Sequence, residues 1–113
     1  MPTDRWYHLL AWFWGGAFVA NVVPHYVQGV SGAPFQSPFA TPPGEGLSSA
    51  LLNVGWSLFN LLVAYLLVVR VGSFDLRKTK HAVVLGVGIA FMSLALAHHF
   101  GPFHGGVDPL IAE

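Results

Sequence analysis

Three long apolar stretches alternate with short polar or proline-rich stretches along the chain. They cover about residues 6–23, 49–69 and 82–99, and none contains Asp, Glu, Lys or Arg. As helices they would be about 27 to 31 Å long, close to the roughly 30 Å hydrocarbon thickness of a bilayer. Because lipid offers a backbone no hydrogen-bond partners, such segments should be α-helical. The pattern predicts an all-α integral membrane protein with three transmembrane helices, forming one domain over residues 1–113.

Composition agrees with a membrane class. The chain is 54% hydrophobic and 9% charged, whereas soluble domains carry about 25% charged residues. Its formal net charge is zero and its basic residues are confined to two short stretches, so nothing suggests a nucleic-acid partner. The absence of cysteine excludes disulfides, thiolate metal sites and cysteine nucleophiles.

The distribution of basic residues predicts the orientation of the spans. With three spans, all five lie on one side, and the opposite side has only the acids Glu45, Asp108 and Glu113. The positive-inside rule places the N-terminus in the cytoplasm and the C-terminus outside, in a plasma (inner) membrane of bacterial type. The first span could be a cleaved signal peptide, but Trp12, Phe13 and Trp14 favour a retained anchor. The basic residues, which also suit contact with lipid headgroups, are Arg5, Arg70, Arg77, Lys78 and Lys80.

Small and polar residues recur at intervals of three and four within the spans, which places them on common helix faces. Small residues let membrane helices approach closely, and asparagine can hydrogen-bond across a contact. We therefore expect these faces to pack against other helices, although Asn60 could instead line a path for a substrate or ion. The predicted packing residues are Gly16, Ala20, Ala50, Asn53, Ser57, Asn60, Ala64, Gly86, Ala90, Ser93 and Ala97.

The connections between spans differ in length and character. The segment 24–48 holds five prolines and several aromatic residues but only one charge, which predicts an ordered loop across the outer mouth of the bundle. A loop this long is either functional or a cap over the helix ends. The inner segment 70–81 is short and basic, and the segment 100–113 forms an outer tail.

Histidines are the residues with the clearest chemical potential. Four of the six fall on the outer side, at the ends of the first and third spans and in the tail. Imidazoles with a carboxylate suit zinc, copper(II) or iron, although no HExxH signature is present. The candidate metal ligands are His25, His98, His99 and His104, with Glu45 and Asp108 as further oxygen donors.

The histidines also admit other interpretations. An inner pair, His8 and His81, and an outer pair could bracket two haems, but His8 and His25, like His81 and His98, are 17 residues apart and would face different directions on a helix. Histidine at a helix end can also simply hydrogen-bond free carbonyls, or serve a proton relay or pH switch.

No conventional catalytic motif supports an enzymatic function, because the chain lacks a GxSxG elbow, a Walker loop and paired carboxylates within a span. The first functional hypothesis is a non-enzymatic membrane protein that acts as a homo-oligomer or as an accessory subunit of a membrane complex. The second is a metal-binding or redox protein that uses the outer histidines. The third is an oligomeric transporter or channel based on Asn53, Ser57 and Asn60.

Overall fold

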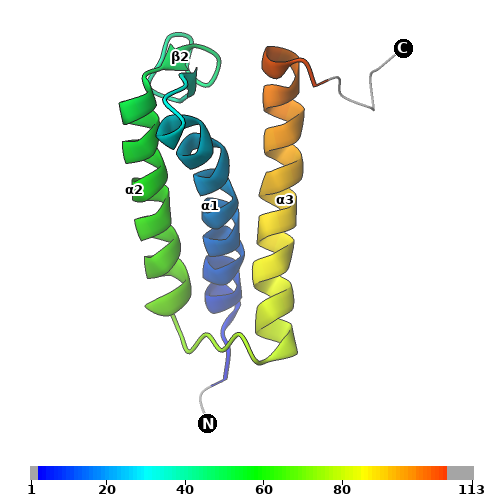
Figure 1. The fold of residues 1–113 in the computed structure, drawn as a ribbon. Coiled ribbons are helices and arrows are strands. Elements are labelled where there is room, and N and C mark those ends of the chain that lie inside the picture. Colours follow the sequence, from blue (N-terminus) through cyan, green and yellow to red (C-terminus); the bar gives the residue numbers. More distant parts are fainter. Residues whose placement is uncertain (1–2, 107–113) are drawn as a thin grey trace, which may run out of the picture.

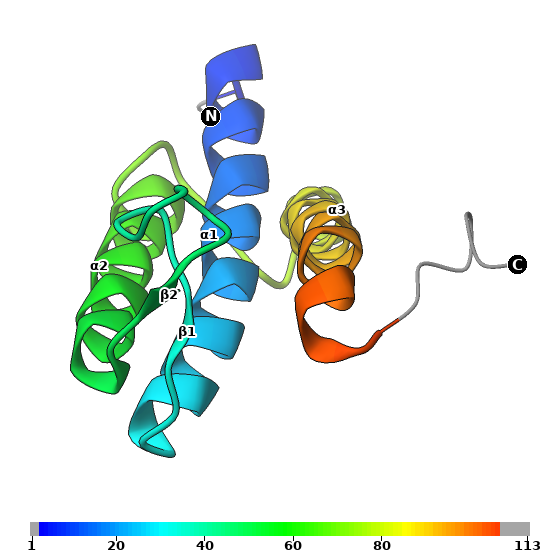
Figure 2. The same ribbon diagram turned by 90° about the horizontal axis from the view of Figure 1, so that it is seen from above.

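The computed structural model describes residues 3–106 as three helices and a small hairpin (Figure 1). Helix α1 lies between α2 and α3, and α2 and α3 make almost no contact with each other (Figures 1 and 2). The α2–α3 connection lies at the end of the molecule where the chain begins. The elements are α1 (Trp6–Val30), β1 (Phe35–Gln36), β2 (Leu47–Ser48), α2 (Ala50–Val69) and α3 (Thr79–His104).

Two helices extend beyond their predicted ends. Helix α1 continues through Pro24 to Val30, and α3 continues through Pro102 to His104. A proline removes one backbone hydrogen bond and crowds the carbonyl four residues earlier, and packing against neighbouring helices lets a helix tolerate both effects. The prediction of a loop over residues 24–48 was therefore wrong for residues 24–30, which belong to α1. Helix α3 ends at His104 and is capped by Gly105, whose left-handed φ of 81° suits a glycine C-cap.

Adjacent glycines bring the backbone of α1 close to both neighbours. Gly15 faces α2, where a Cβ would meet the Val68 side chain, and Gly16 faces α3, where it would meet the Leu85 carbonyl oxygen. Gly88 of α3 faces the α1 backbone at Phe13 in the same way. Because successive helical residues point about 100° apart, a Gly-Gly pair can serve two interfaces at one level.

The long connection between α1 and α2 folds into a hairpin. Strands β1 and β2 are antiparallel, with Phe35 opposite Ser48, and the hydroxyl oxygens of Ser37 and Ser48 lie 2.6 Å apart. The Gly44 N–H donates to the Ser37 carbonyl across the loop at 2.8 Å, and the Thr41–Pro42 peptide bond is cis. This outer segment is therefore ordered by hydrogen bonds and stands over one end of the helices (Figure 1).

Two helices, α2 and α3, are long and apolar enough to cross a membrane, judged over residues 3–106. Helix α1 does not pass the same test of hydropathy, so two of the three predicted spans have this support. Large apolar side chains are widely exposed on the helices, among them Leu51 at 83% and Leu94 at 74%. The molecule thus presents an apolar surface that water would not favour.

Candidate functional site

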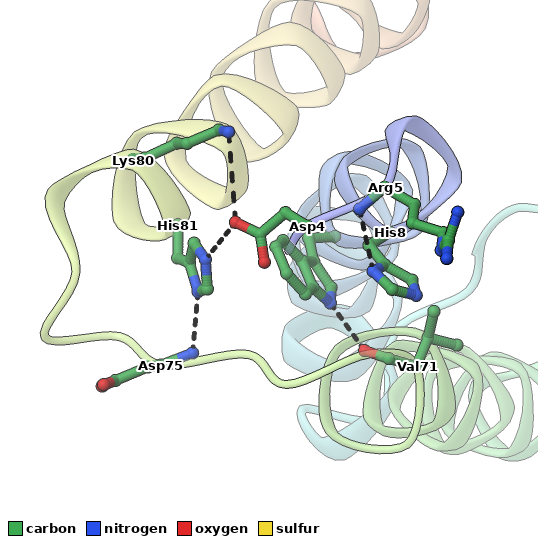
Figure 3. Close-up of polar contacts among 8 residues, drawn as sticks. Asp4, Arg5, His8, Val71, Asp75, Lys80 and His81 are labelled. Carbon is green, nitrogen blue, oxygen red and sulfur yellow. Dashed lines mark hydrogen bonds and ion pairs between the residues drawn. The ribbon is translucent and has the colours of Figure 1, made fainter. Parts of the chain in front are cut away.

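A network of polar contacts links the N-terminal segment to the α2–α3 connection and to the start of α3 (Figure 3). The Asp4 carboxylate lies 2.8 Å from His81 Nε2 and 4.0 Å from Lys80 Nζ. His81 is 1% exposed, and its Nδ1 lies 2.9 Å from the backbone nitrogen of Asp75. One buried imidazole therefore joins three segments that are distant in the sequence.

These contacts give a direction to each hydrogen bond of His81. The Asp75 N–H can only donate, so Nδ1 accepts it. Nε2 donates to the Asp4 carboxylate, because a carboxylate oxygen can only accept. Both ring nitrogens of His81 are therefore used in the fold.

Asp4 is held as a carboxylate. The hydrogen bond from His81 lowers the pKa of Asp4 below its ordinary 3.8, and the nearby charges of Lys80 and Lys78 act in the same direction. Partial burial opposes the shift, since the side chain is 21% exposed. The acid is therefore ionised throughout the physiological pH range.

Trp12 packs against the imidazole rings of both His8 and His81. It is fully buried, and its indole N–H donates to the Val71 carbonyl at 2.9 Å. The imidazole of His81 lies against it at 4.4 Å between ring centroids, and that of His8 at 6.0 Å on the same indole. Gly72, with φ of +63°, closes over these rings, because a Cβ there would come within about 3 Å of His8.

His8 repeats the accepting role of His81. Its Nδ1 accepts the Arg5 backbone N–H at 3.1 Å and so caps the first turn of α1. We call Asp4, His8, Trp12, Asp75 and His81 the inner network. The sequence showed His8 and His81 near one end of the spans, but no signal paired Asp4 with a histidine 77 residues away.

At the opposite end, His25 and Asn53 join α1, the hairpin and α2. The Asn53 amide nitrogen donates to the carbonyl oxygens of Phe35, Ser48 and Ser49 at 3.0 to 3.2 Å. Its Oδ1 lies 2.7 Å from His25 Nδ1, so this ring nitrogen must be the donor. Asn53 is fully buried and His25 is 2% exposed.

The other outer histidines hold the hairpin and α3 together. His99 Nε2 donates to the Gly44 carbonyl at 2.6 Å, and His104 Nε2 donates to Gln36 Oε1 at 2.6 Å. The His104 ring also stacks on Phe35, with ring centroids 4.9 Å apart. Each imidazole thus has its own protein partner.

The described residues do not gather the predicted outer metal ligands around one point. Within residues 3–106 no three His, Asp or Glu side chains gather closely enough to hold a metal ion. His25, His99 and His104 bind Asn53, Gly44 and Gln36 instead, His98 has an interaction of its own, and Glu45 is exposed. Asp108 lies outside the described residues.

The inner histidines do not bracket a space for haem either. The Trp12 indole contacts both His8 and His81, and Nδ1 of each already accepts a backbone N–H. An iron ligand needs a free nitrogen lone pair aimed at open space. Both ring nitrogens of His81 are engaged by Asp75 and Asp4, so neither is free to bind iron.

The polar residues of α2 lie in its contact with α1. The buried residues of this helix are Asn53, Ser57, Asn60 and Ala64, four members of the predicted face. Asn60 Oδ1 accepts the Asn21 amide at 3.0 Å, and Ser57 donates to the Val54 carbonyl at 2.7 Å. These side chains are used in helix packing, so the transport hypothesis loses the feature that motivated it.

The predicted small-residue face of α3 is not its contact with α1. The buried residues of α3 are His81 and Gly88, whereas all four predicted residues are exposed. A Cβ at Gly86 would meet nothing within 4 Å. We call the four residues Gly86, Ala90, Ser93 and Ala97 the α3 stripe, and all four side-chain positions are exposed. Gly16 and Ala20, the corresponding residues of α1, are buried.

All five basic residues are exposed, at the end of the molecule that carries the α2–α3 connection. Arg5 precedes α1, and the other four lie between the end of α2 and the first turn of α3. Lys80 is 62% exposed even though it approaches Asp4. The four others are Arg5, Arg70, Arg77 and Lys78.

A cavity of about 560 Å³ opens between the outer halves of α1 and α3, below β1. Its walls are almost wholly apolar, and His104 stands at its outer end. We call it the α1–α3 groove. Its lining includes Val19, Val23, Phe35, Ile89, Ala97 and His104.

Comparisons of the chain with protein-family models, with curated proteins and with solved structures give no match.

Proposed function

We propose that the chain is a three-span membrane protein that acts, without catalysis, as a homo-oligomer or as an accessory subunit of a membrane complex. The inclusion of α1 as a span rests on its position between α2 and α3. If the two apolar helices cross a bilayer, a helix packed along both occupies the same depth. Its polar residues Asn21 and His25 bond to α2, so they do not oppose insertion.

Orientation follows from the basic residues. All five lie at the end that carries the N-terminus and the α2–α3 connection, and the positive-inside rule makes that end cytoplasmic. The hairpin and the last turn of α3 are then extracytoplasmic. This topology suits a bacterial plasma membrane, with the basic end against anionic headgroups.

The α3 stripe is the observation that carries the proposal of association. The small faces of α1 and α2 are used within the chain, but that of α3 remains exposed. Small residues on a membrane helix permit close approach of another helix. Contact with lipid alone does not require small residues. Ser93 and Ala97 border the groove, so we place the contact at Gly86 and Ala90.

Cysteine cross-linking tests this contact, because the chain has no native cysteine. Ala90→Cys should form a disulfide-linked dimer in oxidised membranes if α3 meets α3, and should capture a partner subunit if the complex is heteromeric. Ala95→Cys is the matched control, since position 95 is exposed on another face of the same helix. Equal cross-linking at 90 and 95, or a strictly monomeric and partnerless protein in nanodiscs, would contradict the proposal.

A further inference from the structure

The α1–α3 groove has the dimensions of a site for a single hydrocarbon chain. From Ile89 to His104 it follows α3 for about 22 Å at 1.5 Å per residue. A cavity of 560 Å³ over that length has a mean cross-section of about 25 Å². A section of this size accommodates one chain of methylenes in van der Waals contact with the walls at about 3.5 to 4.0 Å.

The level of the groove in the molecule matches one leaflet. It begins near the middle of α3 and ends beside the hairpin. Half of a bilayer, headgroup region included, is about 20 to 22 Å thick. The groove thus runs from the bilayer midplane to the outer headgroup level, which is the path of an outer-leaflet acyl chain.

The walls have the chemistry that an acyl chain requires. Val19, Val23, Leu96 and Phe100 supply apolar surface, and the Ser93 hydroxyl is turned to the Ile89 carbonyl at 2.7 Å. His104 is the one histidine in the lining, and it lies at the end of the groove where the acyl chain would join its polar headgroup. His104 donates from Nε2 to Gln36, which leaves Nδ1 of a neutral ring as an acceptor for a headgroup hydroxyl or ammonium.

We propose that the α1–α3 groove binds one acyl chain of an outer-leaflet phospholipid, with its headgroup beside His104. The inference rests on the membrane orientation in the proposed function but not on self-association. A bound lipid would connect α1 and α3 in their outer halves, where no close glycine contact like that of Gly16 and Gly88 joins them.

A photoreactive lipid tests the site directly. The full chain would be placed in nanodiscs of phosphatidylethanolamine and phosphatidylglycerol containing a trace of phospholipid with a diazirine on one acyl chain. We expect labelling of residues 19–24 and 89–101 to exceed that of the exposed leucines of α2, such as Leu58 and Leu62, by at least about fivefold. Even labelling of all apolar faces would overturn the proposal.

Filling the groove supplies the second measurement. Ala97→Leu places a larger side chain in it, and Val23→Phe does so from the opposite wall, so a folding defect in one variant does not remove the test. Each should lower groove labelling at least about fivefold, while Ala95→Leu, the same change outside the groove, should leave it unchanged. Unaltered labelling in Ala97→Leu and Val23→Phe would contradict the site.

Native mass spectrometry identifies the occupant. We expect one retained phospholipid per protomer in the unmodified protein and in Ala95→Leu, and none in Ala97→Leu. Retention of an isoprenoid lipid in its place would overturn the assignment to a phospholipid. A failure of Ala90→Cys to cross-link would count against association alone, whereas recovery in the soluble fraction would contradict the membrane proposal itself.

Discussion

Individual histidines at the two ends of the molecule differ in the direction of their hydrogen bonds. His8 and His81 accept backbone N–H groups at Nδ1. His25, His99 and His104 donate to oxygen acceptors. The imidazoles at one end therefore cap backbone donors, whereas those at the other end bind side-chain and backbone oxygens.

Removal of the His81 ring should destabilise the protein markedly. His81→Ala leaves the Asp75 N–H and the Asp4 carboxylate without their partner and opens a cavity beside Trp12. We expect a loss of about 2 to 3 kcal/mol in the free energy of unfolding, measured in detergent by tryptophan fluorescence. Asp4→Asn retains an oxygen that accepts from Nε2 and should lose less. Equal losses in the two variants would contradict this account.

Asp4 should make stability depend on pH at the acid end. Its folded pKa lies below the ordinary 3.8, so the unfolded chain takes up a proton first as the pH falls. The contribution of Asp4 is complete above about pH 4 to 5 and is lost as the pH drops through the folded value. The difference in melting temperature between the unmodified protein and Asp4→Asn should therefore shrink below about pH 4. A difference that stayed constant down to pH 3 would rule out this linkage.

The Asn53 side chain acts as a hydrogen-bond donor through its amide nitrogen, and an ionised carboxylate has no donor to replace it. Its amide nitrogen faces three carbonyl oxygens, so Asn53→Asp would place oxygen against oxygen in a buried position. We expect this nearly isosteric change to cost about 3 kcal/mol or more and to expose the hairpin to protease. Asn21→Ala, which removes a single donor to Asn60, is the milder comparison. Normal protease resistance in Asn53→Asp would show that the amide does not anchor the hairpin.

The contacts between helices depend on glycines at a few positions, where the two backbones approach closely. Gly16 and Gly88 let the backbones of α1 and α3 approach each other, and Gly15 does the same for α1 and α2. Asparagines add hydrogen bonds across the α1–α2 contact only. α3 has no comparable polar contact with α1 in its middle turns among the described residues, and it is joined mainly at its inner end.

Two glycines of α3 should respond in opposite ways to the same substitution. Gly88→Ala would place a Cβ against the Phe13 carbonyl, and we expect a loss of about 1 to 3 kcal/mol. Gly86→Ala meets nothing within 4 Å and should gain up to about 1 kcal/mol from helix propensity. Thermal unfolding of the protein dispersed as a monomer in detergent measures both effects without a contribution from the proposed contact between subunits. If Gly86→Ala were the more damaging change, the position of α3 against α1 would be different from the one described.

The whole molecule is a row of three helices rather than a closed bundle. α1 is covered on both sides, whereas α2 and α3 each present broad apolar surfaces (Figure 2). This arrangement leaves the α3 stripe and the α1–α3 groove accessible from the surroundings. Both proposals, helix association and binding of an acyl chain, follow from that openness.

Topology can be measured at two serines on opposite ends. Ser31 follows α1 and Ser73 lies in the α2–α3 connection, and both are exposed. In intact cells a membrane-impermeant maleimide should label Ser31→Cys, and should label Ser73→Cys only after the cells are permeabilised. The cysteine-free parent chain provides the background. Labelling of both variants in intact cells would contradict a three-span arrangement.

The sequence by itself determined that the chain forms three long apolar helices, the order of these helices and the helix faces rich in small or polar residues. Those properties depend on length, composition and spacing within each segment. It missed the continuation of α1 through Pro24, because the tolerance of a proline depends on packing around it. Only the tertiary structure decided that His81 meets Asp4, that the outer histidines bind separate partners, and that the α3 stripe stays exposed. Such pairings depend on the rotation of each helix about its axis and on where the hairpin lies, and neither is set by spacing within one segment.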